Sequence, residues 1–251
     1  MLRLILLTLS MASLGVAQGP LRFEVKQVEK KTSACVITFE YPEILSATSP
    51  QVRDRMNAGV LRVLLQRSDW PASDSGFRSL DAYEDAFLSY CAEVQKEPYA
   101  HELYQHKFVT IFRYTPPFLS FRCDADEDAG GVHPFGTTFF VNFDIRTGRA
   151  VALSDLLREG SLPKLQSLAE ATFRRDYKLS PNESLSEHGY SFPGDRFRLN
   201  DNFGLGEREL VFLFNTYEIG PGAMPPTKIA IPYPLIRDLL KPYLQLERPG
   251  E

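Results

Sequence analysis

Two kinds of hydrophobic periodicity divide this chain into strands and helices. Apolar and polar residues alternate over residues 23–30 and 33–41, which predicts a β-hairpin whose second strand ends at Pro42. Similar patterns predict strands at residues 107–114, 118–125, 137–145, 209–217 and 228–231. Apolar residues recur at helical spacing over residues 52–64, 80–94, 162–177 and 235–240. Because hairpins and helix pairs replace a regular strand–helix alternation, we expect an α+β fold with mainly antiparallel sheets packed by helices.

The expected boundary between two subdomains lies at residue 126. Residues 18–126 contain the hairpin, two helices and two strands, and residues 127–251 contain the remaining elements. No repeat, low-complexity tract or flexible linker separates the two parts, so we expect two intimately associated subdomains. A chain of 251 residues is long enough to bury a substantial core.

The first seventeen residues have the composition of a secretory signal peptide. Arg3 precedes an apolar run from Leu4 to Val16, and the small residues Gly15 and Ala17 lie at its end. The run is shorter than the roughly 20 residues that span a bilayer, and no second long apolar segment follows. We therefore expect residues 1–17 to be cleaved and the mature protein to be secreted or periplasmic, without a transmembrane segment. An anchor that is not cleaved is the alternative.

Charge and motif spacing narrow the class of partner. The chain has a formal net charge of −4 and a sequence pI of about 5.7, without a long basic run. Nucleic acid is therefore not an expected partner. His101 and His106 stand five residues apart, about 140° around a helix, so they do not form a zinc-protease motif. For this reason we expect no metal site. No phosphate-binding glycine loop precedes a helix, and we expect no cofactor.

Three cysteines, Cys35, Cys91 and Cys123, lie in the part that is expected to be exported. An oxidising compartment permits one disulfide among three thiols. Each cysteine falls on the apolar face of its element, so all three are expected to be buried. The pairing is open, and three buried free thiols are the alternative. A reactive nucleophile is disfavoured, because apolar surroundings raise the pKa of a thiol.

The most specific motifs lie in the second half of the chain. They are Gly-Gly-Val-His at 130–133, Asn-Phe-Asp at 142–144, Thr-Gly at 147–148, Asn-Phe at 202–203, Tyr-Glu-Ile-Gly-Pro at 217–221 and Ile-Pro-Tyr at 231–233. In the first half, Tyr-Pro-Glu-Ile at 41–44 and Asn57 add to them. In this order, the motifs resemble the extracytoplasmic region shared by RsiV-type anti-sigma factors and the accessory part of PdaC-type peptidoglycan deacetylases. The resemblance spans nearly the whole mature chain.

This resemblance implies a cell-envelope module that binds or senses a ligand. The anti-sigma relatives bind lysozyme, and the deacetylase relatives carry their chemistry in a separate domain, so the resemblance does not imply catalysis. The partner that it implies is an extracytoplasmic protein of the lysozyme type or a cell-wall polymer such as peptidoglycan.

Loops rich in glycine and proline are the expected contact regions, because rigid strands present such loops to a ligand. The candidate binding residues are Gly130, Gly131, His133, Phe135, Tyr217, Glu218 and Met224. Asn142, Asp144 and Gly148 are expected to be structural, with the two polar side chains bonded to the backbone around the turn at 147–148. A wall-directed hydrolase that uses Asp144, Glu218 and His133 is one alternative. A structural envelope protein is another.

Overall fold

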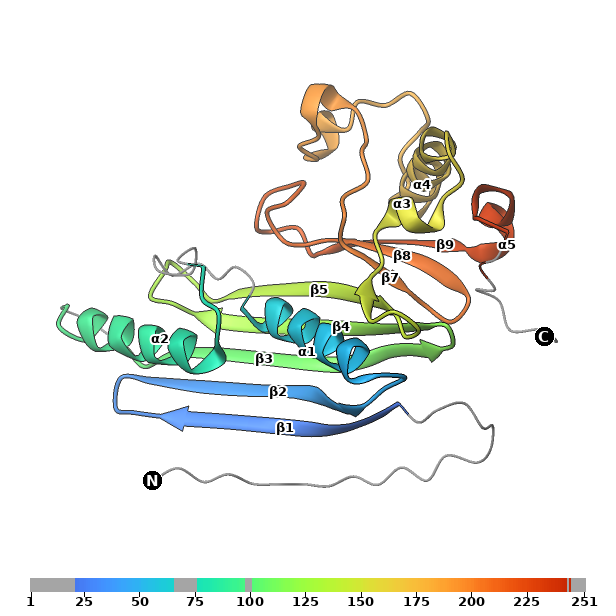
Figure 1. Cartoon of the computed structure of the whole chain (residues 1–251). Helices are drawn as coiled ribbons and strands as arrows, with labels where there is room; N and C mark the ends of the chain where they lie inside the picture. Colours follow the sequence, from blue (N-terminus) through green and yellow to red (C-terminus); the bar gives the residue numbers. More distant parts are fainter. Residues whose placement is uncertain (1–20, 66–75, 98–100, 243, 245–251) are drawn as a thin grey trace. The chain divides into compact units, whose positions relative to one another are not determined.

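The computed structural model of the chain describes residues 21–65, 76–97, 101–242 and 244. The expected signal peptide, residues 1–17, lies outside this part. The described residues form an α+β fold with two sheets and packed helices, as the periodicity predicts (Figure 1). None of the helices in these residues is long and apolar enough to cross a membrane.

The two sheets contain six and three strands. The larger has the order β1-β2-β3-β4-β5-β6, with the bounds Arg22–Lys31, Cys35–Ser46, Leu103–Thr115, Phe118–Asp128, Phe135–Asp144 and Arg149–Ala150. The smaller has the order β7-β8-β9, with the bounds Phe203–Leu205, Glu209–Phe214 and Thr227–Pro232. The helices α1 to α5 are Pro50–Leu64, Leu80–Val94, Leu153–Leu156, Leu162–Asp176 and Tyr233–Ile236. Short 3-10 turns η1 to η3 lie at Ser186–His188, Pro193–Asp195 and Arg237–Leu239.

The chain divides into two compact units, each made of several segments. Among the described residues, the first unit comprises those within 1–110, 122–138 and 145–149, and the second comprises those within 111–121, 139–144 and 150–251. Strands β3, β4 and β5 therefore contribute residues to both units. The expected boundary at residue 126 falls inside β4, within the first unit.

The first unit begins with the predicted hairpin, in which β1 pairs antiparallel with β2. Strand β2 then pairs in parallel with β3, with Cys35 opposite Leu103. Parallel neighbours need a long crossover connection, and the segment between β2 and β3 supplies one that contains α1 and α2. This parallel pair departs from the mainly antiparallel pattern expected from the sequence.

The expectation that Pro42 ends the second strand is wrong, because β2 continues to Ser46. Pairing of β2 with β3 stops at Glu40. The N–H group that a proline lacks is therefore not needed for a bond to β3 at position 42. Pro42 still lies opposite Val25 of β1.

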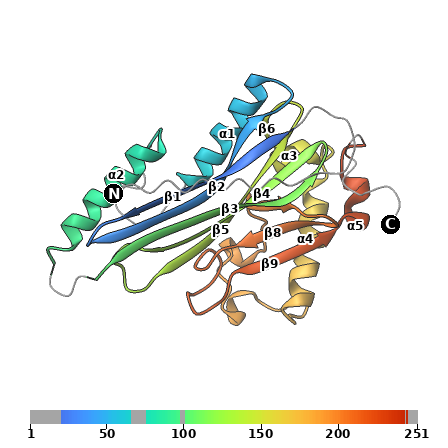
Figure 2. The ribbon, with the colours of Figure 1, turned by 90° about the horizontal axis from the view of Figure 1, so that it is seen from below.

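Helices α1 and α2 begin at serine caps and pack on the same face of the larger sheet (Figures 1 and 2). The Ser49 hydroxyl accepts a hydrogen bond from the Val52 N–H at 3.3 Å, and the Ser79 hydroxyl accepts one from the Ala82 N–H at 3.3 Å. Contacts between α2 and this face form one buried cluster of the first unit, made of Ala34, Cys35, Ile37, Phe39, Tyr83, Phe87, Cys91 and Leu103.

Lys107 is buried in the first unit at the end of α1. Its Nζ donates to the Leu64 carbonyl at 2.7 Å and to the Tyr83 hydroxyl at 2.9 Å. The same ammonium lies 4.6 Å from the centre of the Tyr83 ring. A positive charge at the last carbonyls of a helix is stabilising, and an aromatic face adds to this attraction.

We expect Lys107→Met to lower the free energy of unfolding by about 2 kcal/mol, because it removes two buried charge-assisted hydrogen bonds and keeps most of the side-chain volume. Urea unfolding followed by circular dichroism measures the effect. Lys96→Met, at an exposed lysine after α2, is the control and is expected to change the value by less than about 0.5 kcal/mol. Equal effects of the two substitutions would contradict the assignment.

The second unit is built on the smaller sheet. Strand β8 is central and pairs antiparallel with both β7 and β9. Helix α4 packs against β9. Aromatic side chains fill much of the core between them and the following loop, with Phe173 of α4 in edge contact with Tyr190 at 4.8 Å and stacked on Phe197 at 5.5 Å.

Candidate functional site

The predicted loop at Gly130 is fixed in the first unit by side chains that bond its backbone. Asp128 accepts a hydrogen bond from the Gly130 N–H at 2.9 Å, and Tyr90 donates to the Ala129 carbonyl at 2.7 Å. The Nε2 of His101 lies 2.9 Å from the other oxygen of Asp128. Gly130 has a φ of +82°, which glycine adopts without strain. The glycine therefore serves the turn.

The rest of this loop is open to solvent. Val132 is fully exposed, Gly131 and His133 are also exposed, and Phe135 is half-buried at the start of β5. The Nδ1 of His133 lies 3.2 Å from the Pro134 carbonyl. These residues present an exposed surface.

The second predicted loop, residues 218–226, belongs to the second unit. Together with Tyr217 before it we call it loop 217–226, and its side chains interlock. Tyr217 is 51% exposed and has a φ of +68°, and its ring occupies the space where a side chain at Gly222 would stand. Met224 packs against Gly220 and Gly189, whose missing side chains make room for it. A rigid loop loses little conformational freedom when a ligand binds.

Both carboxylate oxygens of Glu218 are engaged within this loop region. One accepts the Asn215 N–H at 2.9 Å, and the other accepts the side-chain amide of Asn200 at 2.7 Å. The same amide of Asn200 donates to the Leu213 carbonyl at 2.7 Å. Glu218 is therefore a loop-building residue, and Asn200 connects the loop to the segment 199–201.

Asn142 joins strand β5 to strand β7 inside the second unit. Its amide donates to the Phe203 carbonyl at 2.8 Å, and its oxygen accepts the Leu205 N–H at 3.1 Å as well as the Ser120 hydroxyl. The structural role predicted for Asn142 thus has different partners from those expected, since the side chain bonds β7 and not the turn at 147–148. Asp144 ends β5.

Other motif residues also build the second unit. The oxygen of the Asn202 side chain accepts the Phe140 N–H at 3.0 Å, and the Tyr233 hydroxyl donates to the Gly206 carbonyl at 3.0 Å. Gly204 has no space for a side chain, because the rings of Phe112 and Phe140 lie against it. The signature motifs therefore specify the fold.

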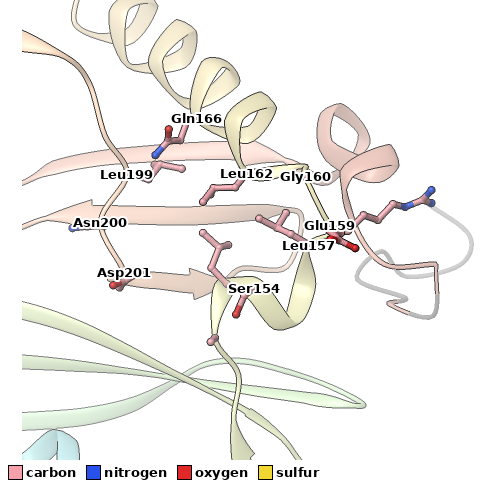
Figure 3. Close-up of a pocket in the computed structure, with 12 residues that line it drawn as sticks. Ser154, Leu157, Glu159, Gly160, Leu162, Gln166, Leu199, Asn200 and Asp201 are labelled. Carbon is pink, nitrogen blue, oxygen red and sulfur yellow. The ribbon is translucent and has the colours of Figure 1, made fainter.

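A pocket of about 390 Å³ lies in the second unit, at the junction of α3, the start of α4 and the segment 199–201 (Figure 3). We call it the α3–α4 pocket. Its lining is Ala152, Leu153, Ser154, Leu157, Arg158, Glu159, Gly160, Leu162, Gln166, Leu199, Asn200 and Asp201. A pocket of this size can hold a small molecule or a few side chains of a larger ligand.

The segment that follows η3 supports the wall of this pocket. The Arg158 N–H donates to the Leu239 carbonyl at 2.8 Å, and its Nε donates to the Leu240 carbonyl at 2.7 Å. The Lys241 N–H in turn donates to the Leu156 carbonyl at 2.9 Å. The loop between α3 and α4 is thereby held by backbone bonds and leaves its other side chains available.

The pocket is lined by leucines and by polar side chains that make no side-chain hydrogen bond or ion pair within the described part of the chain. Leu157, Leu162 and Leu199 lie around one space in Figure 3, and Leu162 is 46% exposed at its edge. Among the residues that the structure describes, no side-chain hydrogen bond or ion pair involves four other lining residues: Ser154, Glu159, Gln166 and Asp201. Unlike Glu218 and Asn142, these groups can bond a ligand without breaking an internal contact.

The sequence did not indicate this pocket. Its lining comes from α3, the α3–α4 loop, α4 and the segment 199–201, none of which carries a recognisable motif. In the sequence, Leu162 fits the apolar face of α4. Only the structure shows that it is exposed. In the described part of the chain, no group of three His, Cys, Asp or Glu residues could hold a metal ion.

Residues 154–234 match the model of a family described as protein of unknown function, DUF3298, and this segment lies wholly in the second unit. No curated protein matches the chain. The solved structures that are similar to it include a member of the DUF3298 family from Bacteroides fragilis, with 22% identity and a TM-score of 0.73 over 89% of this chain and 94% of the other. A DUF3298 family protein from Pseudomonas aeruginosa has 19% identity and a TM-score of 0.68 over 93% and 99% of the two chains. Residues 154–234 are thus similar to the DUF3298 family, and the chain shares its fold with both proteins.

Proposed function

We propose that this chain is a secreted or periplasmic, non-enzymatic domain that binds a protein or a cell-wall polymer, and that the α3–α4 pocket and the adjoining loop 217–226 hold the ligand. The observation that carries the proposal is the set of uncommitted polar side chains beside exposed leucine in the pocket. Most of the pocket lining falls in the segment that matches the DUF3298 model.

The lining favours a ligand that brings hydrogen-bond donors and small apolar groups. Glu159 and Asp201 are acceptors when ionised, and with Arg158 they give the lining a formal net charge of −1. Peptide stems of a bacterial wall present amide and amine donors next to methyl groups. A cationic protein of the lysozyme type presents lysine and arginine side chains, and its association with an acidic surface weakens as salt rises.

Binding is better supported than the hydrolase alternative. A general acid or base must exchange a proton with the substrate through an accessible oxygen or nitrogen. Both oxygens of Glu218 already accept hydrogen bonds from Asn215 and Asn200. The geometry of Glu218 therefore favours a role in holding the loop.

Retention of the mature protein on peptidoglycan, and separately on immobilised lysozyme, tests the proposal. We expect the wild type to be retained on one of the two and Leu162→Asp to reduce retention by roughly tenfold or more, because it places a charge at the apolar edge of the pocket. Leu235→Asp is the matched control, since Leu235 is a 58% exposed leucine of the second unit that does not line the pocket.

Three outcomes would contradict the proposal. Absence of wild-type retention on both baits would favour a structural envelope protein. Equal retention of Leu162→Asp and Leu235→Asp would place binding elsewhere. Release of soluble wall fragments by the wild type would favour the hydrolase.

A further inference from the structure

Cys35 and Cys91 meet in the core of the first unit. Cys35 is the first residue of β2 and Cys91 lies in the last turn of α2, and both are fully buried in the same cluster. The two thiols interact with each other, and this interaction lowers the pKa of Cys35 and, together with burial, raises the pKa of Cys91.

The hairpin turn holds Cys35 in place. The Thr32 hydroxyl accepts the Cys35 N–H at 3.0 Å, and the Thr32 N–H donates to the Cys35 carbonyl at 2.9 Å. On the other side, α2 packs Cys91 next to Phe87 in the same cluster. Both cysteines therefore face the same buried cluster, one from the sheet and one from the helix.

Cys123 has a different setting. It is buried in β4, outside the cluster that contains the other two cysteines. Burial raises the pKa of Cys123 to about 12, so its reactive thiolate form is scarce at neutral pH. Of the three pairings that the sequence leaves open, the structure favours one.

We propose that Cys35 and Cys91 form an intramolecular disulfide when the chain folds under oxidising conditions, and that Cys123 stays a thiol. The thiolate of one of the two cysteines attacks a disulfide oxidant, forms a mixed disulfide and releases one thiolate of the oxidant. The other cysteine then loses its proton, attacks the first cysteine's sulfur and releases the second thiolate. The two cysteines lose two electrons and two protons in total, and the oxidant is reduced to two thiols.

The bond would fasten α2 to the start of β2 and close the crossover that contains α1. Because both sulfurs are fully buried in the folded unit, the exchange with the oxidant must take place during folding. The proposed disulfide does not depend on the ligand of the second unit. It depends on the proposed export only for its formation in the cell.

Oxidative refolding of the reduced, denatured full chain in a mixture of reduced and oxidised glutathione tests the disulfide without reference to location. The product is denatured without reductant, alkylated with iodoacetamide and digested. We expect the label on Cys123 alone, and a linked pair of peptides that contain Cys35 and Cys91. In native buffer, reduction by dithiothreitol should be roughly tenfold or more slower than in denaturant, because the buried sulfurs are inaccessible.

Cys123→Ser is expected to retain the linked pair and to take no label. Cys35→Ser is expected to take label on both remaining cysteines even if it folds poorly, because the labelling is done in denaturant. Labelling of all three cysteines in the wild type, or a linked peptide that contains Cys123, would overturn the proposal.

Discussion

Asn142→Leu is expected to lower the free energy of unfolding by about 3 to 5 kcal/mol. The side chain is 3% exposed and bonds the Phe203 carbonyl, the Leu205 N–H and the Ser120 hydroxyl. Leucine has a similar volume but cannot replace these bonds. Each buried polar group that loses its partner costs about 1 to 3 kcal/mol. The Phe203 carbonyl and the Ser120 hydroxyl lose this partner, whereas the Leu205 N–H keeps a hydrogen bond to the Ser120 oxygen at 3.3 Å.

Urea unfolding monitored by circular dichroism measures this change. Asn182→Leu is the control, because Asn182 is exposed in the loop after α4, and its effect should stay within about 0.5 kcal/mol. If Asn142→Leu lowered stability no more than the control, the role of Asn142 as a connection between β5 and β7 would be wrong.

Gly148→Ala is expected to cost about 3 kcal/mol or more. Gly148 has a φ of +67°, and an added Cβ would lie 2.5 Å from the Val52 carbonyl oxygen and 2.9 Å from the Val52 Cα in α1. A left-handed conformation costs a residue with a side chain about 1 to 2 kcal/mol, and a forced shift of packed backbone adds a similar amount. The turn is also held by Arg55, which donates to the Thr147 carbonyl at 3.1 Å.

Gly194→Ala separates the two contributions. Gly194 has a nearly equal φ of +64°, but nothing lies within 4 Å of the position that its Cβ would take. We expect this control to lose only about 1 to 2 kcal/mol in the same thermal or urea unfolding experiment. Equal losses for the two alanines would show that contact with α1 does not fix Gly148.

Much of the fold follows from the sequence, because local patterns determine the elements. Ser49 and the helical spacing after it predict α1, and the alternation on both sides of Thr32 predicts the hairpin. The parallel pairing of β2 with β3 did not follow, since strand neighbours are chosen by packing over a crossover of many residues. The prediction that Pro42 ends a strand failed because the effect of a proline depends on the neighbouring strand. A proline interrupts a strand only where the neighbour needs a bond from the N–H group that proline lacks.

The candidate site was less predictable than the fold. The sequence shows that Glu218 is a carboxylate, but not that Asn215 and Asn200 occupy its oxygens. Conversely, Asp201 and Ser154 belong to no pattern and become informative only because the fold places them beside Leu162 without partners. Motif residues such as Asn142 and Gly148 identify the fold because they build it.

The central claim is that a ligand binds at the α3–α4 pocket and the loop 217–226, and hydrogen–deuterium exchange tests it most directly. The mature protein is compared with and without the soluble form of whichever bait retains it, either lysozyme or solubilised wall peptide. We predict slower exchange on binding in peptides that cover residues 153–166, 199–201 and 217–226, and no such protection in Leu162→Asp. Protection confined to residues 130–136, or unchanged exchange throughout, would contradict the account.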